Sequence, residues 1–138
     1  MNLDKKATIL ICVTAQNACD RLIKIGSDIA KSFDYNIHIL MVRPQVSDYA
    51  PMSNEIEYLY QTAKDYNGEM TIIFDNDAAK TAVDFAKKIN AKRLVTGMPD
   101  GKLNGFIVRF HEAMPNLPIS MVAKDNTIYN MDKQNTSA

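Results

Sequence analysis

Short apolar runs alternate along this chain with longer segments in which apolar residues recur every three or four positions. A continuous apolar run is typical of a parallel strand covered on both faces, and the longer spacing is typical of a helix with one buried face. This alternation constrains the fold most, because it leaves few arrangements other than strand–helix–strand units. The expected strands are ATILICV (7–13), NIHILMV (36–42), EMTIIF (69–74), KRLVTG (92–97) and ISMVA (119–123).

Four helices are expected between these strands, and their first residues are good helix caps. Asn17 precedes the first helix, Ser53 the second, and the run DND (75–77) the third. The fourth helical pattern extends from about residue 104 to 114. Right-handed crossovers between successive parallel strands then place helices on both faces of one sheet.

We therefore expect an α/β fold built on a single doubly wound, five-stranded parallel sheet. The natural strand order is 3-2-1-4-5, a Rossmann-like arrangement. The domain is expected to cover residues 1–124. Residues 125–138 are mostly polar and are expected to form a flexible C-terminal tail.

The composition favours a soluble protein without a strong field for nucleic acid or for a membrane. Sixteen basic residues balance sixteen acidic ones, and 46% of the 138 residues are hydrophobic. No apolar stretch has the length of a signal peptide or a membrane span, so a cytoplasmic location is expected. Cys12 and Cys19 have neither the spacing of a metal pair nor that of a redox motif.

Ligands of doubly wound sheets lie beyond the carboxyl ends of the strands where the winding reverses, here after strands one and four. The second of these places is rich in glycine, at Gly97, Gly101 and Gly105. Unhindered N–H groups that lead into a helix favour an anion, and Lys102 or Arg43 would add positive charge. The alternative is a simple turn, with Gly105 allowing close packing.

Several segments together resemble the universal stress proteins, and most closely the variant found inside potassium-sensor histidine kinases. The similarity extends over roughly residues 7 to 124. The segments that carry it are ATILICVTAQNACDRLIKIGSDIA, NIHILMVRP, DNDAAKTAVDFAKKINAKRLVTG and PISMVA.

The resemblance implies a 3-2-1-4-5 sheet, a homodimer formed through the last strand (Ile119 to Ala123), and a regulatory, non-catalytic role in the stress response. It also implies frequent binding of ATP or another adenine nucleotide, and in some kinase-embedded members an association with cyclic di-adenylate. In the nucleotide-binding members an acidic residue ends strand one, the backbone after strand two holds the base, and a glycine motif follows strand four.

This chain departs from the family pattern in two places. Thr14 or Ala15 stands where those members have the acid, and no Gly-Ser or Gly-Thr pair follows Gly97 and Gly101. Three hypotheses follow: a nucleotide-binding regulatory module, an interaction module that has lost its nucleotide site, and, as the weakest, a nucleotide-hydrolysing enzyme. A possible protein partner is left open.

The candidate site gathers residues at the ends of strands one to four. Asn17 and Asp75 have helix capping as an alternative role, and His38 and His111 are expected to be structural because no nucleophile accompanies them. No catalytic residue and no metal site are predicted. The candidate nucleotide-binding residues are Thr14, Ala15, Asn17, Val42, Arg43, Asp75, Gly97, Met98, Gly101 and Lys102.

Overall fold

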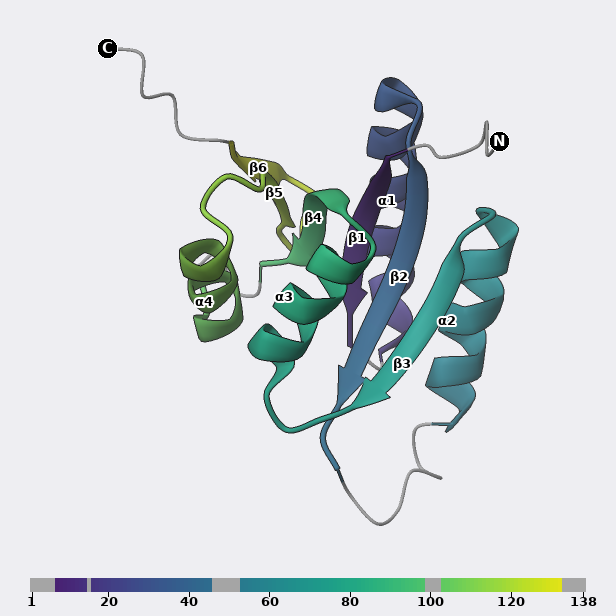
Figure 1. Cartoon of the computed structure of the whole chain (residues 1–138). Coiled ribbons are helices and arrows are strands. Elements are labelled where there is room, and N and C mark those ends of the chain that lie inside the picture. The colour runs from purple at the N-terminus through teal and green to yellow at the C-terminus, as the bar shows by residue number, and fades with distance from the viewer. Residues whose placement is uncertain (1–6, 15, 46–52, 99–102, 133–138) are drawn as a thin grey trace, which may run out of the picture.

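The computed structural model describes residues 7–14, 16–45, 53–98 and 103–132. Within these ranges the chain forms one six-stranded sheet in the order β3-β2-β1-β4-β5-β6 (Figure 1). The first five strands are parallel to their neighbours, and β6 is antiparallel to β5. The strands are β1 (Thr8–Val13), β2 (Asn36–Arg43), β3 (Glu69–Phe74), β4 (Ala91–Gly97), β5 (Ile119–Val122) and β6 (Ile128–Met131). The predicted order of β1 to β5 is found within this sheet, but the sheet has six strands with one antiparallel pair rather than the predicted five parallel strands.

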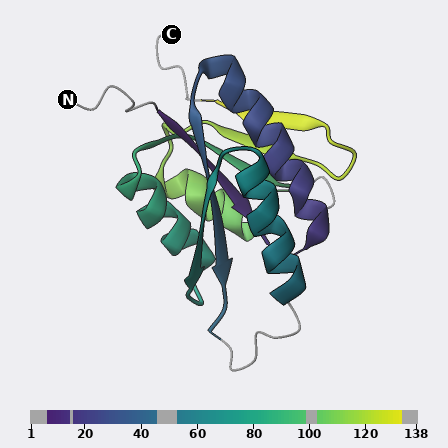
Figure 2. The same cartoon turned by 90° about the vertical axis from the view of Figure 1, so that its right-hand side faces the viewer.

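Helices cover both faces of the sheet, as the sequence predicts. The short 3₁₀ helix η1 (Asn17–Cys19) leads into α1 (Asp20–Phe33), which lies with α2 (Ser53–Asp65) on one face. The other face carries α3 (Ala78–Lys88) and α4 (Gly105–Ala113). Figures 1 and 2 show the two helical layers with the sheet between them.

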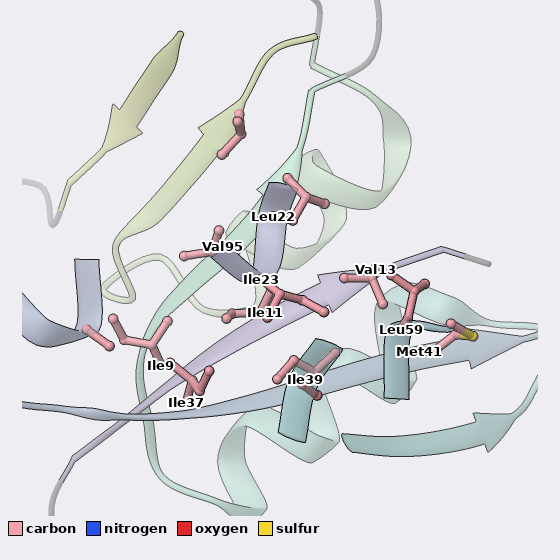
Figure 3. Packing of buried hydrophobic residues seen from close by; sticks show 13 residues of the cluster. Ile9, Ile11, Val13, Leu22, Ile23, Ile37, Ile39, Met41, Leu59 and Val95 are labelled. Carbon is pink, nitrogen blue, oxygen red and sulfur yellow. The ribbon is translucent and has the colours of Figure 1, made fainter. Parts of the chain in front are cut away.

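The core between α1 and the sheet is formed by aliphatic side chains, shown in Figure 3. Ile11 on β1 is fully buried there, beside Ile23 from α1 and Val95 from β4. Gly26 brings α1 close to β1, because a Cβ atom at this position would overlap Ile11 Cδ1. The close approach fixes how α1 packs against β1 and β4.

Side-chain caps fix where α3 and α4 begin. Asp77 accepts a hydrogen bond from the Lys80 N–H at 3.1 Å, as its position after β3 predicts. Asn104 accepts one from the Ile107 N–H at 2.9 Å. These bonds satisfy N–H groups that a helix cannot pair internally.

Residues 128–131, expected within a flexible tail, instead form β6, so the sheet continues past residue 124. The turn before β6 is well bonded: Asp125 accepts from the Thr127 N–H, and Asn126 has a φ of 69°. A polar side-chain network then holds the strand. Arg93 donates to Ser120 Oγ at 3.0 Å, and Ser120 donates to Asn130 Oδ1 at 2.7 Å.

The sixth strand also changes which strand lies at the edge of the sheet. The last strand of the resemblance, Ile119 to Ala123, through which a homodimer is implied, contains β5, and β5 is paired on one side with β4 and on the other with β6. β6 thus supplies, within the same chain, partners for the N–H and C=O groups on the second side of β5.

None of the helices in the described ranges is long and apolar enough to span a bilayer.

Candidate functional site

A cavity of about 480 Å³ opens beyond the carboxyl ends of β1, β2 and β4. Its position is the place where the winding of the sheet reverses, and its volume is in the range of small-molecule sites. The first turn of α1, the first residues of α3 and α4, and the residue after Ala123 complete its wall. The lining residues are Cys12, Val13, Thr14, Gln16, Cys19, Arg21, Leu22, Leu40, Val42, Ala78, Thr96, Gly97, Met98, Asn104, Phe106 and Lys124.

Four of the predicted residues lie on this cavity: Thr14, Val42, Gly97 and Met98. They come from the ends of three strands, as the argument from the switch point predicts. Asn17 is the first residue of η1. The remaining candidates Ala15, Gly101 and Lys102 fall outside the described residues, and so does the middle of the glycine-rich segment.

Arg43 and Asp75 meet each other at the end of the β2–β3 pair. The Asp75 N–H donates to the Arg43 carbonyl at 2.8 Å, and the Asp75 carboxylate accepts from the Asp77 N–H at 2.8 Å. Neither residue is among those that line the cavity. Asp75 thus forms the turn before α3, whereas the sequence offered helix capping as its alternative role, and the cap of α3 is Asp77.

On the α1 side, the cavity wall is polar. Thr14 Oγ1 and Cys19 Sγ are 3.4 Å apart. The side chain of Arg21 extends from α1 to the end of β5, where its Nη1 donates to the carbonyl of Ala123 at 3.0 Å. The next residue, Lys124, also lines the cavity. The side chains of Arg21 and Lys124 therefore place two positive charges at that end of the cavity which lies between α1 and the end of β5.

On the α3 and α4 side, charges are paired. The guanidinium of Arg109 contacts both carboxylate oxygens of Asp77 at 3.0 Å. The hydrogen bond from Arg109, followed by that from the Lys80 N–H, lowers the pKa of Asp77. The same bond raises the pKa of Arg109. This pair ties the start of α3 to α4 next to the cavity.

The thiol of Cys12 lies half-buried in the wall of the cavity. Burial raises the pKa of Cys12 to about 12, so the thiol stays protonated at neutral pH. Across the described ranges, no three His, Cys, Asp or Glu side chains converge as metal ligands do.

His38 has a structural place, as the sequence predicts. His38 Nε2 lies 2.8 Å from Thr71 Oγ1, and its ring packs edge-on against Phe85. Burial lowers the pKa of His38, although Glu69, at 3.7 Å from Nδ1, opposes that shift. His111 lies on α4, where its Nδ1 has no hydrogen-bond partner among the described residues.

Sequence reasoning missed Arg21, Phe106 and Lys124 as lining residues. Their signals were present: Arg21 is in the first turn after a switch-point strand, Phe106 in the first turn of α4, and Lys124 directly after β5. The topology alone could therefore have nominated all three, because each element begins or ends at the same edge of the sheet.

Comparison with known proteins identifies the fold. No protein-family model matches the chain, and no curated protein matches it. Solved structures do match: a universal stress protein from Archaeoglobus fulgidus has 14% identity and a TM-score of 0.68, covering 83% of this chain and 92% of its own. This chain has the universal stress protein fold.

Two further structures with the universal stress protein fold contain nucleotides. One is the A. fulgidus protein in complex with dAMP, at 14% identity and a TM-score of 0.65, with 83% of this chain and 96% of that chain covered. The other is a universal stress protein in complex with cAMP, at 14% identity and a TM-score of 0.62, with 88% and 98% covered. Similarity at this level of identity establishes the fold alone.

Proposed function

We propose that this protein is a universal stress protein-like regulatory module that binds an adenine nucleotide in the switch-point cavity without transforming it. The observation that carries the proposal is the lining of the cavity. The described lining residues are mostly apolar, two are cations, and none is a carboxylate. A planar base with an anionic group is the class of ligand that such a lining accommodates.

The shape of the site supports this ligand class. The backbone at Val42 lies at the end of β2, where an adenine edge can be hydrogen-bonded without any particular side chain. Gly97 leaves space at the end of β4, because an added Cβ would meet only Leu22 Cδ1, at 3.7 Å. The dAMP and cAMP complexes of proteins with the same fold favour the same class.

We propose binding rather than catalysis because the lining offers little for proton transfer or nucleophilic attack. The described lining contains neither a carboxylate nor a histidine, and the Cys12 thiol is held protonated. In this proposal the module acts in the cytoplasm and transmits ligand occupancy to a partner surface. Its specific relationship to the domain of potassium-sensor histidine kinases stays a prediction from the sequence motifs.

Isothermal titration calorimetry and thermal unfolding with AMP, dAMP, cAMP, ATP and cyclic di-adenylate test the proposal. A ligand at ten times its Kd adds about 1.4 kcal/mol of stability, which is readily measured. Gly97→Val places a branched side chain in the cavity and is expected to abolish the effect. Gly105→Ala is the matched control, since a Cβ there meets nothing within 4 Å. No stabilisation by any of these nucleotides at millimolar concentration overturns the proposal.

One observation favours the alternative of an interaction module without a nucleotide. Thr14, an exposed residue without charge, stands at the end of β1 where the resemblance expects an acid. In that case the same titrations show no binding, and the surfaces of the module carry its function.

A further inference from the structure

Within the described ranges, the charged residues that line the cavity lie at one end of it. Among the described lining residues, the charged ones are Arg21 and Lys124, and both are close to the carboxyl end of β5. The apolar residues Leu40 and Val42 lie at the β2 end. Because β1 and β4 separate β2 from β5, the two ends are about 14 Å apart at a strand spacing of about 4.8 Å.

Arg21 is held in place before any ligand arrives. Its Nη1 donates to the carbonyl of Ala123 at 3.0 Å, in a partly buried bond that spans α1 and the end of β5. The Ala123 carbonyl also accepts from the Asn126 N–H at 2.9 Å, and so it is fixed by the turn before β6. A guanidinium has five N–H donors, so a single anchoring bond leaves others able to reach an anion.

The opposite wall is less suited to an anion. The Asn104 side chain already caps the start of α4, and Asp77 caps α3. Asp77 and Asp75 also bring negative charge to the turn before α3, where Arg109 pairs with Asp77. A phosphate near this wall would compete with the existing caps and would be repelled by the carboxylates.

We infer that the cavity has a phosphate subsite formed by Arg21 and Lys124, at the end of the cavity between α1 and β5. This inference rests on the proposed function and specifies the ligand as a nucleotide with a terminal phosphate monoester. The base lies toward Leu40 and Val42, and the phosphate accepts hydrogen bonds from the anchored guanidinium.

Calorimetric titration of AMP and adenosine into the full chain and its variants tests this subsite. The wild type is expected to bind AMP at least about tenfold more tightly than adenosine, since charge-assisted hydrogen bonds are the strong ones. Arg21→Gln is expected to weaken AMP about tenfold and Lys124→Gln severalfold, with adenosine unchanged. Lys92→Gln is the matched control, because this exposed cation lies at the amino end of β4, away from the cavity.

The dependence of the AMP affinity on salt concentration provides a second readout, which would not change if Arg21 and Lys124 had only a structural role. The AMP affinity of the wild type is expected to fall between 50 and 500 mM NaCl, and that of the Arg21→Gln, Lys124→Gln double variant is expected to fall much less. Lys124→Gln keeps the test valid if loss of the Arg21–Ala123 bond disturbs the fold.

The outcomes separate the two proposals. If AMP binds the wild type but the cavity variants bind it as tightly, or lose adenosine and AMP equally, the subsite is overturned while nucleotide binding stands. If neither AMP nor adenosine binds the wild type, the proposed function fails and the subsite fails with it.

Discussion

Gly26→Ala tests the packing of α1 on the sheet most sharply. The new Cβ would overlap Ile11 Cδ1 and would lie 2.8 Å from Ile11 Cγ1, which is closer than real contacts allow. Ile11 is fully buried in the core cluster of this face, so its side chain has little room to move. The residue at this position must therefore either be glycine or displace a core side chain.

The expected magnitude follows from two opposing terms. Overpacking a core costs about 1–3 kcal/mol, and a clash with two atoms of a fully buried side chain belongs in the upper half of that range. Alanine is favoured over glycine inside a helix by about 1 kcal/mol, which opposes the loss. We expect Gly26→Ala to lower the free energy of unfolding by about 1–2 kcal/mol.

The assay is urea unfolding followed by far-UV circular dichroism, with Gly105→Ala as the control. A Cβ at Gly105 meets nothing within 4 Å, so that variant is expected to be as stable as the wild type or slightly more stable. Ile11→Val removes the Cδ1 atom that the new methyl overlaps. The double variant Gly26→Ala, Ile11→Val should therefore lose less stability than the sum of the single changes. Equal stability of Gly26→Ala and wild type, or additive losses in the double variant, would refute this account.

Three further predictions concern other parts of the fold. Asp77→Ala removes the cap of α3 and the ion pair with Arg109. Because the pKa of Asp77 is lowered in the folded protein, the stability that its carboxylate contributes is present above its ordinary pKa of 3.8 and is lost as the pH falls through the folded-state pKa. Urea unfolding should therefore show the variant to be less stable than the wild type at pH 7, and this difference should fade on acidification. A difference that does not change with pH contradicts this. Asn130→Ala leaves the buried Ser120 hydroxyl without its acceptor and should lower the free energy of unfolding by about 1 kcal/mol. Amide hydrogen exchange should become faster in β5 and β6 but not in β1, and unchanged exchange in β6 argues against the hydrogen-bond network. At pH 8 iodoacetamide should alkylate Cys12 much more slowly in the folded protein than in urea, because the raised pKa keeps the thiol protonated, and mass spectrometry measures both rates. Equally rapid labelling of the folded and unfolded protein contradicts the raised pKa.

The parallel part of the sheet could be predicted from the sequence because its strands are continuous apolar runs. ATILICV and NIHILMV lie side by side as β1 and β2, and helical spacing between them marks a crossover. β6 could not be predicted in the same way. Its sequence IYNM is short and its neighbours are polar. Its place depends on side-chain hydrogen bonds that link Arg93, Ser120 and Asn130, which lie on three different strands.

The site was predictable to the extent that it follows from topology. Thr14, Val42, Gly97 and Met98 stand at strand ends, and the winding of the sheet brings such ends together. The position of Arg21 at the start of α1 follows from the topology, but its hydrogen bond to the carbonyl of Ala123 does not, because the bond joins residues 102 positions apart. No spacing along the chain encodes that contact.

The most direct test of the central claim is an NMR titration of the ¹⁵N-labelled protein with AMP. The account predicts saturable amide shift changes that are concentrated on the cavity, at Thr14, Arg21, Gly97 and Lys124, with little change at Gly68 or Tyr129. Absence of shift changes at millimolar AMP, or changes that avoid the carboxyl ends of β1 and β4, would contradict nucleotide binding at the switch point.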